Sequence, residues 1–274
     1  FRIQQDGLIT FKEAIQPLAD GTIGFVMEWI QKGEDIRDWL QLQRKAMNQK
    51  EFILLAWRLL WRLVRLTCAL HRRGFLHNDI KPSNVFICGK HNDFQIYLLD
   101  LGIARHKSEP LPKCMGTKTF SAPECMETNI AGPLIGLDRG DESSDLYALV
   151  QTWVRSIHPN FQCALTPDDL GLPEMSSVIP IKLQQLLKHT LKPQHSRMYR
   201  SSYDFLHALT NCLLFDLPQP TFIDRSAAAW GIEFIEWYKC PLSQLTLPQK
   251  SPSAVHGPTL IPQKSGIFCQ YVRD

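Results

Sequence analysis

The chain has 274 residues, of which 44% are apolar and 21% are charged, and its formal net charge is +3. This composition predicts a globular protein with a sizeable core, and the small net charge disfavours nucleic acid as the main partner. No apolar run reaches the roughly 18 to 20 residues of a membrane span, so we expect none. The eight cysteines contain no CxxC pair, which disfavours a zinc site and indicates an intracellular protein, cytoplasmic or nuclear.

The first thirty residues are rich in β-forming side chains. Residues 7–15 and 21–30 predict two antiparallel strands, separated by Pro17 and the turn-forming pair Asp20 and Gly21. These strands begin a chain that becomes helical further on.

A long helix is predicted from about residue 49 to residue 72, after a shorter helical stretch from 34 to 46. Asn48 and Glu51 form a capping-box pattern at its start. Its buried face is marked by leucines at three- and four-residue spacing, Leu55, Leu59, Leu63, Leu66 and Leu70. We interpret Arg58, Arg62 and Arg65 as a solvated stripe, and Trp57 and Trp61 as packing residues.

The middle of the chain combines one hairpin with several helices. Residues 84–89 and 94–100 predict two strands of a β-hairpin. Helices are predicted at 143–157, with Ser143 or Ser144 as cap, and at 180–191, 201–214 and 227–238. The last residues, rich in Pro, Ser, Gln and Lys, form either a linker or a docking segment. Strands followed by helices indicate an α+β fold.

Four polar side chains have the chemistry that phosphoryl transfer from ATP needs. The reaction requires a carboxylate to orient and deprotonate a hydroxyl, ligands for a metal ion, and a cation against the developing charge. Asp79, Lys81 and Asn84 lie within one loop, and Asp100 follows the next strand. We therefore consider this loop the candidate catalytic centre.

At these residues the chain resembles the eukaryotic protein kinases of the serine/threonine type. The catalytic loop HxDxKxxN appears at 77–84, the metal motif at 100–102, and the end of the activation segment at 116–124. The resemblance covers roughly residues 8–214. It implies a protein-kinase-like α+β fold, with a remnant of the small lobe and the hinge at 1–30, a mainly helical large lobe at 31–214, and an extension at 215–274.

The resemblance implies a role for each motif residue. Asp79 would be the catalytic base, Asn84 and Asp100 the magnesium ligands, and Lys81 the contact of the γ-phosphate. Thr117 would bond to Asp79 and Lys81. ATP and Mg²⁺ are the implied cofactors, and the implied substrate is a protein with a serine or threonine hydroxyl.

The same resemblance implies where the nucleotide base and ribose would bind. Met27 would be the gatekeeper, and the backbone of Glu28 and Ile30 would hold the adenine. Phe86 would lie beneath the base and Glu34 near the ribose.

Further residues are expected to support the centre rather than react. By the resemblance, His77 is a buried structural residue and Asp145 anchors the backbone of the catalytic loop. The arginine of the segment 200–202 is expected to pair with Glu124.

Two departures from the family pattern affect the interpretation. Asn78 stands where most members have an arginine that meets a phosphate on the activation segment, so we expect activity independent of such a phosphate. About 26 residues precede Met27, without the GxGxxG loop. We expect this segment alone to bind ATP poorly and to phosphorylate nothing measurable.

Two alternatives stay open at this point. A pseudokinase or scaffold would bind partners without catalysis, which the missing small-lobe motifs favour. Small-molecule kinases such as those for choline carry a His-Asn-Asp triplet like residues 77–79, but Lys81-Pro82 and the 122–124 motif favour a protein kinase.

Overall fold

The computed structural model describes much of the chain between residues 11 and 216. Backbone and side chains are described for 30, 32–90, 93–109, 116–126, 140–161 and 163–213, and the backbone alone for 11–15, 24–27 and 214–216. The predicted helix at 227–238 and the tail lie outside the described residues. The predicted domain division at 30 and 214 stays a prediction.

Strands come first and helices dominate afterwards. The strands are β1 Phe11–Ile15, β2 Gly24–Met27, β3 Gly33–Asp35, β4 Phe75–Leu76, β5 Val85–Lys90, β6 Asp93–Leu98 and β7 Arg105–His106. The helices are α1 Ile36–Ala46, α2 Gln49–Arg72, α3 Pro123–Met126, α4 Glu142–Ile157, α5 Pro173–Ser176, α6 Ile181–Thr190 and α7 Ser202–Asp216. Three short 3₁₀ turns are η1 Pro82–Asn84, η2 Asp169–Gly171 and η3 Gln194–Ser196. The predicted α+β, mainly helical fold is confirmed.

Helix α2 begins and ends as its local sequence predicts. The Asn48 side chain accepts from the Glu51 amide, and the Glu51 carboxylate accepts from the Asn48 amide, each at 3.0 Å. The five leucines of the predicted face are all buried. Trp57 and Trp61 are buried as well, and their indole N–H groups donate to Val178 O at 3.0 Å and Thr210 Oγ1 at 3.1 Å. Both tryptophans are packing residues with a satisfied polar group.

The predicted solvated arginine stripe is wrong for Arg58. This residue is 8% exposed, and its guanidinium lies 5.2 Å from the centre of the Phe94 ring in β6. Arg62 lies 4.7 Å from the same ring. The hairpin therefore covers this side of α2, which a helical pattern cannot reveal because the covering strand comes from elsewhere in the chain.

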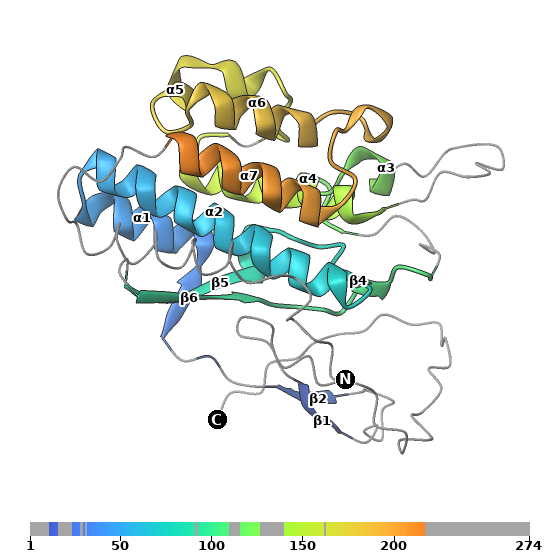
Figure 1. The fold of residues 1–274 in the computed structure, drawn as a ribbon. Helices are drawn as coiled ribbons and strands as arrows, with labels where there is room; N and C mark the ends of the chain where they lie inside the picture. The colour runs from blue at the N-terminus through green and yellow to red at the C-terminus, as the bar shows by residue number, and fades with distance from the viewer. Residues whose placement is uncertain are drawn as a thin grey trace. The chain divides into compact units, whose positions relative to one another are not determined.

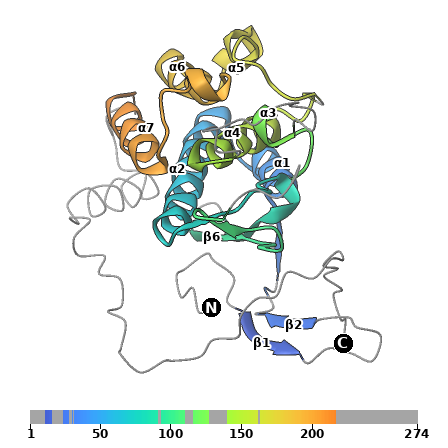
Figure 2. The ribbon, with the colours of Figure 1, turned by 90° about the vertical axis from the view of Figure 1, so that its right-hand side faces the viewer.

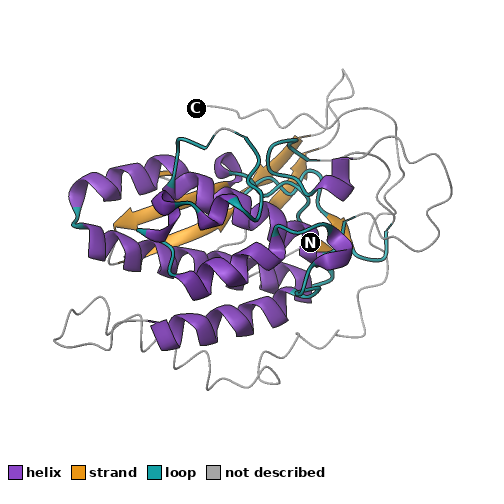
Figure 3. Cartoon of the chain, turned by 90° about the horizontal axis from the view of Figure 1, so that it is seen from above, coloured by secondary structure: helices purple, strands orange, loops and turns teal. Residues whose placement is uncertain are grey.

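The helical body lies against one small sheet (Figure 1). β5 pairs antiparallel with β3 on one side and β6 on the other. In Figures 1 and 2, β5 and β6 run below α1 and α2, while α6 and α7 lie on the opposite side of the body. Figure 3 shows the helices spread over the strands. Separately, β1 and β2 form a two-stranded sheet.

Helix α4 is buried along nearly all of its length, from Ser143 to Ile157. Its cap is Asp141, whose Oδ1 accepts from the amides of Ser143 at 2.8 Å and Ser144 at 3.2 Å. The predicted caps Ser143 and Ser144 are therefore wrong, since both lie inside the first turn. Asp141 satisfies the free amides of a helix end that is largely shielded from water.

Three short strands escaped the sequence prediction: β3 occupies the start of the helical stretch predicted at 34–46, and β4 and β7 have two residues each. β4 pairs antiparallel with β7, with Phe75 opposite His106 and Leu76 opposite Arg105. Two-residue strands carry no measurable periodicity, so only their pairing reveals them. No helix in the described part of the chain is long and apolar enough to cross a membrane.

Candidate active site

The backbone of the loop after β4 is fixed by a buried carboxylate. Asp145 in α4 accepts from the amide of His77 at 2.7 Å and from that of Asn78 at 2.9 Å. His77 is fully buried, and its Nε2 lies 3.0 Å from Leu99 O. Burial lowers the pKa of His77 and so favours the neutral ring; because this ring is fully buried and engaged with Leu99 O, it is a structural residue.

Asn78 has a left-handed backbone with φ 64°, a conformation that asparagine tolerates better than most residues. Its side-chain amide donates to Ile103 O at 2.9 Å. Asn78 thus ties the loop to the segment that follows Asp100. This anchoring of the backbone accounts for an asparagine at position 78 without any contact to a phosphate.

Asp79 is the centre of a cluster of hydrogen bonds. Its Oδ1 accepts from Thr117 Oγ1 at 2.8 Å, and its Oδ2 lies 2.7 Å from Lys81 Nζ and 3.2 Å from Asn84 Nδ2. Lys81 Nζ also donates to Thr117 Oγ1 at 3.1 Å. Both contacts expected of Thr117 are therefore present. The aspartate side chain keeps 11% of its area accessible and that of Lys81 keeps 25%, so a substrate can reach them.

Asn84 and Asp100 lie on neighbouring strand ends. Asn84 Nδ2 donates to the backbone oxygen of Asp79 at 2.9 Å, which leaves its Oδ1 as the atom able to bind a cation. Asn84 O accepts from Leu99 N at 2.8 Å, so the residue before Asp100 is bonded directly to Asn84. Asp100 is exposed, and one carboxylate oxygen accepts from Gly102 N at 3.1 Å.

The chain bends sharply at Asp100 rather than at the nearby Gly102. Asp100 has φ 59°, whereas no positive φ is found at Gly102. The hydrogen bond from Gly102 N to the Asp100 carboxylate holds this turn, as aspartate side chains often do in turns. The strained conformation presents the carboxylate beyond the end of the strand.

The oxygen atoms of Asn84 and Asp100 fit a magnesium ion. Amide and carboxylate oxygens are the ligands that Mg²⁺ prefers, and this ion takes its remaining ligands from water and phosphate. Among the described residues, no three His, Cys, Asp or Glu side chains cluster to hold a metal ion. Two protein oxygens would leave positions on such an ion for phosphate and water.

Three of the residues expected around the nucleotide lie on strands: Met27 on β2, Glu34 on β3 and Phe86 on β5. Phe86 on β5 is half-buried and pairs with Asp35, and Glu34 on β3 is exposed and pairs with Ile87. A Cβ atom at Gly33 would lie 2.3 Å from the Phe86 ring, so this glycine lets the ring lie against β3. Ile30 is half-buried.

The remaining two base-binding candidates cannot be placed. The side chain of Met27, in β2, and all of Glu28 lie outside the described residues. Their assignments stay predictions.

The predicted partner of Glu124 is wrong. Arg197, not Arg200, makes the ion pair, with N–O distances of 2.5 and 3.0 Å to the two carboxylate oxygens. Arg200 is half exposed and lies 3.7 Å from Asp141. The 3₁₀ turn η3 directs Arg197 inward, where it is 4% exposed, and leaves Arg200 outside.

A matching sequence profile now decides the family. The profile described as Protein kinase domain matches residues 2–213. The chain belongs to the protein kinase family. Asp79, Lys81, Asn84, Asp100 and Thr117 all fall inside the matched part of this kinase.

Curated relatives of the kinase chain are named as protein kinases, one of them as a serine/threonine kinase. It is 31% identical over 134 residues to serine/threonine-protein kinase cds1 of Schizosaccharomyces pombe, covering 47% of this chain and 26% of the relative. It is 29% identical over 94 residues to mitogen-activated protein kinase 14 of Xenopus laevis, covering 34% of this chain and 24% of the relative. The matches thus span about a quarter of these curated relatives.

A solved kinase domain has the same fold. A double mutant of the Mycobacterium tuberculosis PknI kinase domain aligns with a TM-score of 0.50 and 21% identity. The alignment covers 76% of this chain and 72% of that one. At this identity the likeness concerns the fold alone.

The sequence pattern missed two residues that support the kinase site. Arg155 in α4 donates to Thr119 O at 2.9 Å and lies 4.3 Å from the centre of the Phe120 ring. His71 in α2 is buried between Asp145, at 2.8 Å, and Glu142, at 3.3 Å. The only available signal for either was a polar residue among the apolar positions of its helix, and both helices contain several such residues.

The buried histidine changes the ionisation of its neighbours. Burial by itself lowers the pKa of His71, but hydrogen bonds and charges from Asp145 and Glu142 outweigh it and raise the pKa above the ordinary value. Burial likewise opposes ionisation of Asp145, yet His71 and the His77 amide hold its pKa below the usual range. The cluster is therefore a charged internal anchor for the catalytic loop.

Proposed function

We propose that this chain is the catalytic part of a serine/threonine protein kinase that transfers the γ-phosphoryl group of ATP to a protein hydroxyl. The observation that carries the proposal is the Asp79 cluster: one carboxylate bonded to Thr117 at 2.8 Å, Lys81 at 2.7 Å and Asn84 at 3.2 Å. The family match supports the reaction class.

Asp79 is the base that orients the acceptor hydroxyl and takes its proton. Thr117 and Lys81 hold the carboxylate from two sides, so it need not reorganise when the hydroxyl arrives. The partly exposed ammonium of Lys81 opposes the negative charge that develops on the transferred group. Lysine at this position, with Thr117 beside it, supports a serine or threonine acceptor.

Asn84 and Asp100 hold magnesium through their side-chain oxygens. When bound, ATP and Mg²⁺ supply the phosphoryl group and neutralise its charge. The exposed carboxylate of Asp100, set by its left-handed φ, and the oriented amide of Asn84 are suited to this task. Phe86, Ile30 and Glu34, with Met27 and Glu28, form the proposed surface for adenine and ribose.

The test compares two aspartates that each follow a His-Asn pair, and all transfer assays use the full-length protein, because this segment alone is expected to phosphorylate nothing measurable. Asp79→Asn keeps the size of the side chain but removes the base, so phosphorylation of protein substrates should fall about 10² to 10⁴-fold. Asp93→Asn is the matched control: it follows His91 and Asn92 in the sequence, Asp93 itself is exposed, and the substitution should leave the rate unchanged. Thermal unfolding of both variants checks their folding.

Three outcomes would contradict the proposal. Equal activity of the Asp79 and Asp93 variants would remove Asp79 from the reaction. Transfer to amino alcohols but not to peptides would indicate a small-molecule kinase. Absence of any transfer, with intact binding of protein partners, would favour a scaffold.

A further inference from the structure

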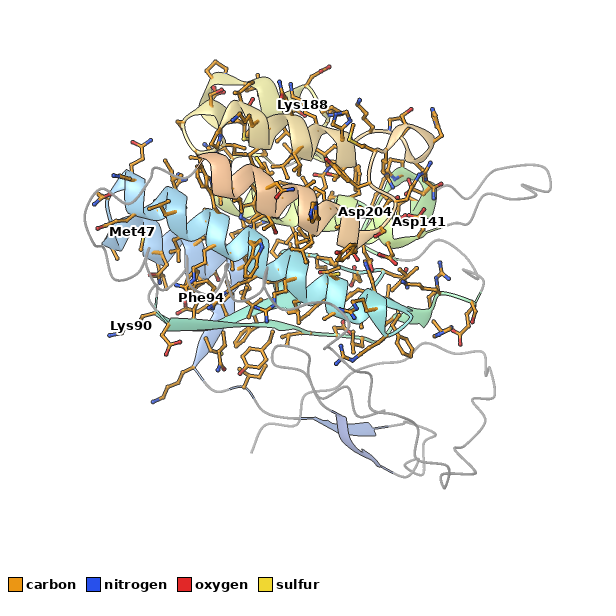
Figure 4. The ribbon with its side chains drawn as sticks, viewed as in Figure 1. Met47, Lys90, Phe94, Asp141, Lys188 and Asp204 are labelled. Carbon is orange, nitrogen blue, oxygen red and sulfur yellow. The ribbon has the colours of Figure 1, made fainter. Side chains whose placement is uncertain are left out.

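Helix α4 carries two buried polar side chains that hold two separate segments of the active site. In Figures 1 and 2 the helix lies in the middle of the helical body, between α6 and the strands, and Figure 4 labels Asp141 at its start. Thr152 is fully buried, and its Oγ1 donates to Ile80 O at 3.2 Å. Arg155 is 5% exposed, and its Nη1 donates to Thr119 O at 2.9 Å. Because residues three apart share one face of a helix, the same face of α4 contacts both segments.

The segment that Arg155 contacts is a tight turn that begins at Thr117. Thr117 O accepts from the amides of Phe120 at 2.8 Å and Ser121 at 2.9 Å. Besides its bond to Thr119 O, the Arg155 guanidinium lies 4.3 Å from the centre of the buried Phe120 ring, a favourable cation–π distance. Arg155 therefore holds the turn by a backbone oxygen and by a ring, and the turn in turn holds Thr117.

The position of the Thr117 hydroxyl matters because two charged side chains share it. The hydroxyl donates to Asp79 Oδ1 at 2.8 Å and accepts from Lys81 Nζ at 3.1 Å. It has a single proton to donate, so a shift of the turn would take from Asp79 the bond that orients its carboxylate. On the other side of this bond, Thr152 holds the oxygen of Ile80, the residue that follows Asp79. Helix α4 thus sets the separation of the two bonded side chains.

We propose that Arg155 is a positioning residue of the phosphoryl transfer, which keeps the Thr117 hydroxyl on Asp79 by fixing the turn between Thr117 and Phe120. This inference rests on the proposed function and adds a residue that acts on the base from a distance. A displacement of about 1 Å at a reacting group can slow a reaction by about 10²-fold. Loss of Arg155 should therefore lower kcat about 10- to 10²-fold. The KM for ATP should not change, because the residues proposed to bind adenine and ribose lie on other segments of the chain.

The experiment compares buried variants of α4 in the full-length protein. Arg155→Met keeps an apolar stem and removes the guanidinium, whereas Arg155→Lys keeps a cation and should retain part of the lost kcat. Gln151→Leu is the matched control, because Gln151 is fully buried on the same helix and bonds to both Leu165 O at 2.7 Å and Leu165 N at 2.9 Å. It should lower the unfolding temperature, as Arg155→Met does, but leave kcat within about twofold. Equal losses of kcat in Arg155→Met and Gln151→Leu would overturn the proposal.

A double-mutant cycle shows whether Arg155 acts through the Thr117 hydroxyl. Thr117→Val removes this hydroxyl and keeps the size of the side chain. In that background Arg155→Met should lower kcat by a further factor of less than about two, because the bond that Arg155 protects is already absent. The same fold loss of kcat with and without the hydroxyl would assign Arg155 to general stability and overturn the proposal. If Arg155→Met does not fold, Arg155→Lys takes its place in the cycle.

Amide hydrogen exchange separates this inference from the proposed function. The amides of Phe120 and Ser121, which donate to Thr117 O, should exchange at least about tenfold faster in Arg155→Met than in Gln151→Leu. Faster exchange in a protein that transfers no phosphoryl group would confirm that Arg155 fixes the turn and would overturn the proposed reaction. Phosphoryl transfer with unchanged kcat and unchanged exchange in Arg155→Met would overturn the role of Arg155 and leave the kinase proposal intact.

Discussion

Two charged clusters lie close together in the molecule and differ in their exposure to water. The side chains of His71 and Asp145 are 1% and 3% exposed, whereas those of Asp79 and Lys81 are 11% and 25% exposed. Both Asp145 oxygens are used inside the protein, by His71 and by the amides of His77 and Asn78. The inner cluster therefore holds the loop, and the outer cluster can exchange its partners for a substrate.

This difference in exposure gives Asp145 and Asp79 different roles, although both are carboxylates. A buried carboxylate whose hydrogen bonds are all satisfied contributes stability and geometry. A carboxylate at the edge of the solvent, with a cation and a hydroxyl beside it, is suited to chemistry. Substitutions can test whether stability and activity divide in this way.

Asp145→Ala is expected to have the largest effect on folding. It leaves two loop amides and the buried His71 without their partner, which costs about 3 to 5 kcal/mol of unfolding free energy. Urea unfolding measures the loss. Asp79→Asn is the control, and it should change stability by less than about 1 kcal/mol. A similar loss of unfolding free energy in both variants would contradict the view that Asp145 serves stability and Asp79 does not.

Arg197→Ala should cost somewhat less, about 3 kcal/mol, because it leaves Glu124 without a buried bidentate partner. Arg200→Ala is the matched control three residues away, half exposed and 3.7 Å from Asp141. We expect it to cost less than about 1 kcal/mol. If Arg200 proved the more important arginine in thermal unfolding, the observed pairing of Glu124 would be incorrect.

The inner cluster should make stability depend on pH. The pKa of His71 is raised in the folded state. The stability gained from its positive charge is therefore fully present below about pH 6.5 and is lost as the pH rises through the raised pKa. The pKa values of Asp145 and Glu142 are lowered in the folded state. The stability that these two carboxylates contribute is therefore lost at acid pH, as the pH falls through the lowered values.

Unfolding in urea at about pH 6 and about pH 9 tests this dependence. The stability difference between the unaltered protein and His71→Gln should shrink as the pH rises. A constant or growing difference would show that His71 is neutral in the folded protein. Gln provides the control because it cannot take a proton.

The smallest effect is expected at the exposed hydroxyls of the activation segment. Asn78 donates to Ile103 O, and Asp145 accepts from the amides of His77 and Asn78, so we expect this loop to be ordered without a phosphate. Ser108→Ala and Thr119→Ala, alone and together, should leave the kinase rate within about twofold. A collapse of activity that Asp or Glu at these positions rescued would overturn this expectation.

Local sequence signals predicted the parts of the fold that depend on near neighbours. Asn48 and Glu51 defined the start of α2 because a capping box spans only three residues. The leucine spacing identified its buried face. The motif order brought Asp79, Lys81, Asn84 and Thr117 into one prediction, and their side chains are in contact.

The sequence by itself thus determined the longer helices, the β5–β6 hairpin, the family resemblance and the set of polar residues around Asp79. Only the tertiary structure decided which arginine meets Glu124, that Arg58 is buried beneath Phe94, and that the bend falls at Asp100. These features depend on partners such as Arg197, which is 73 residues from Glu124. A local sequence pattern reveals the hydrophobic periodicity and the side-chain chemistry of a segment. Which surface covers that segment depends on how distant parts of the chain pack together.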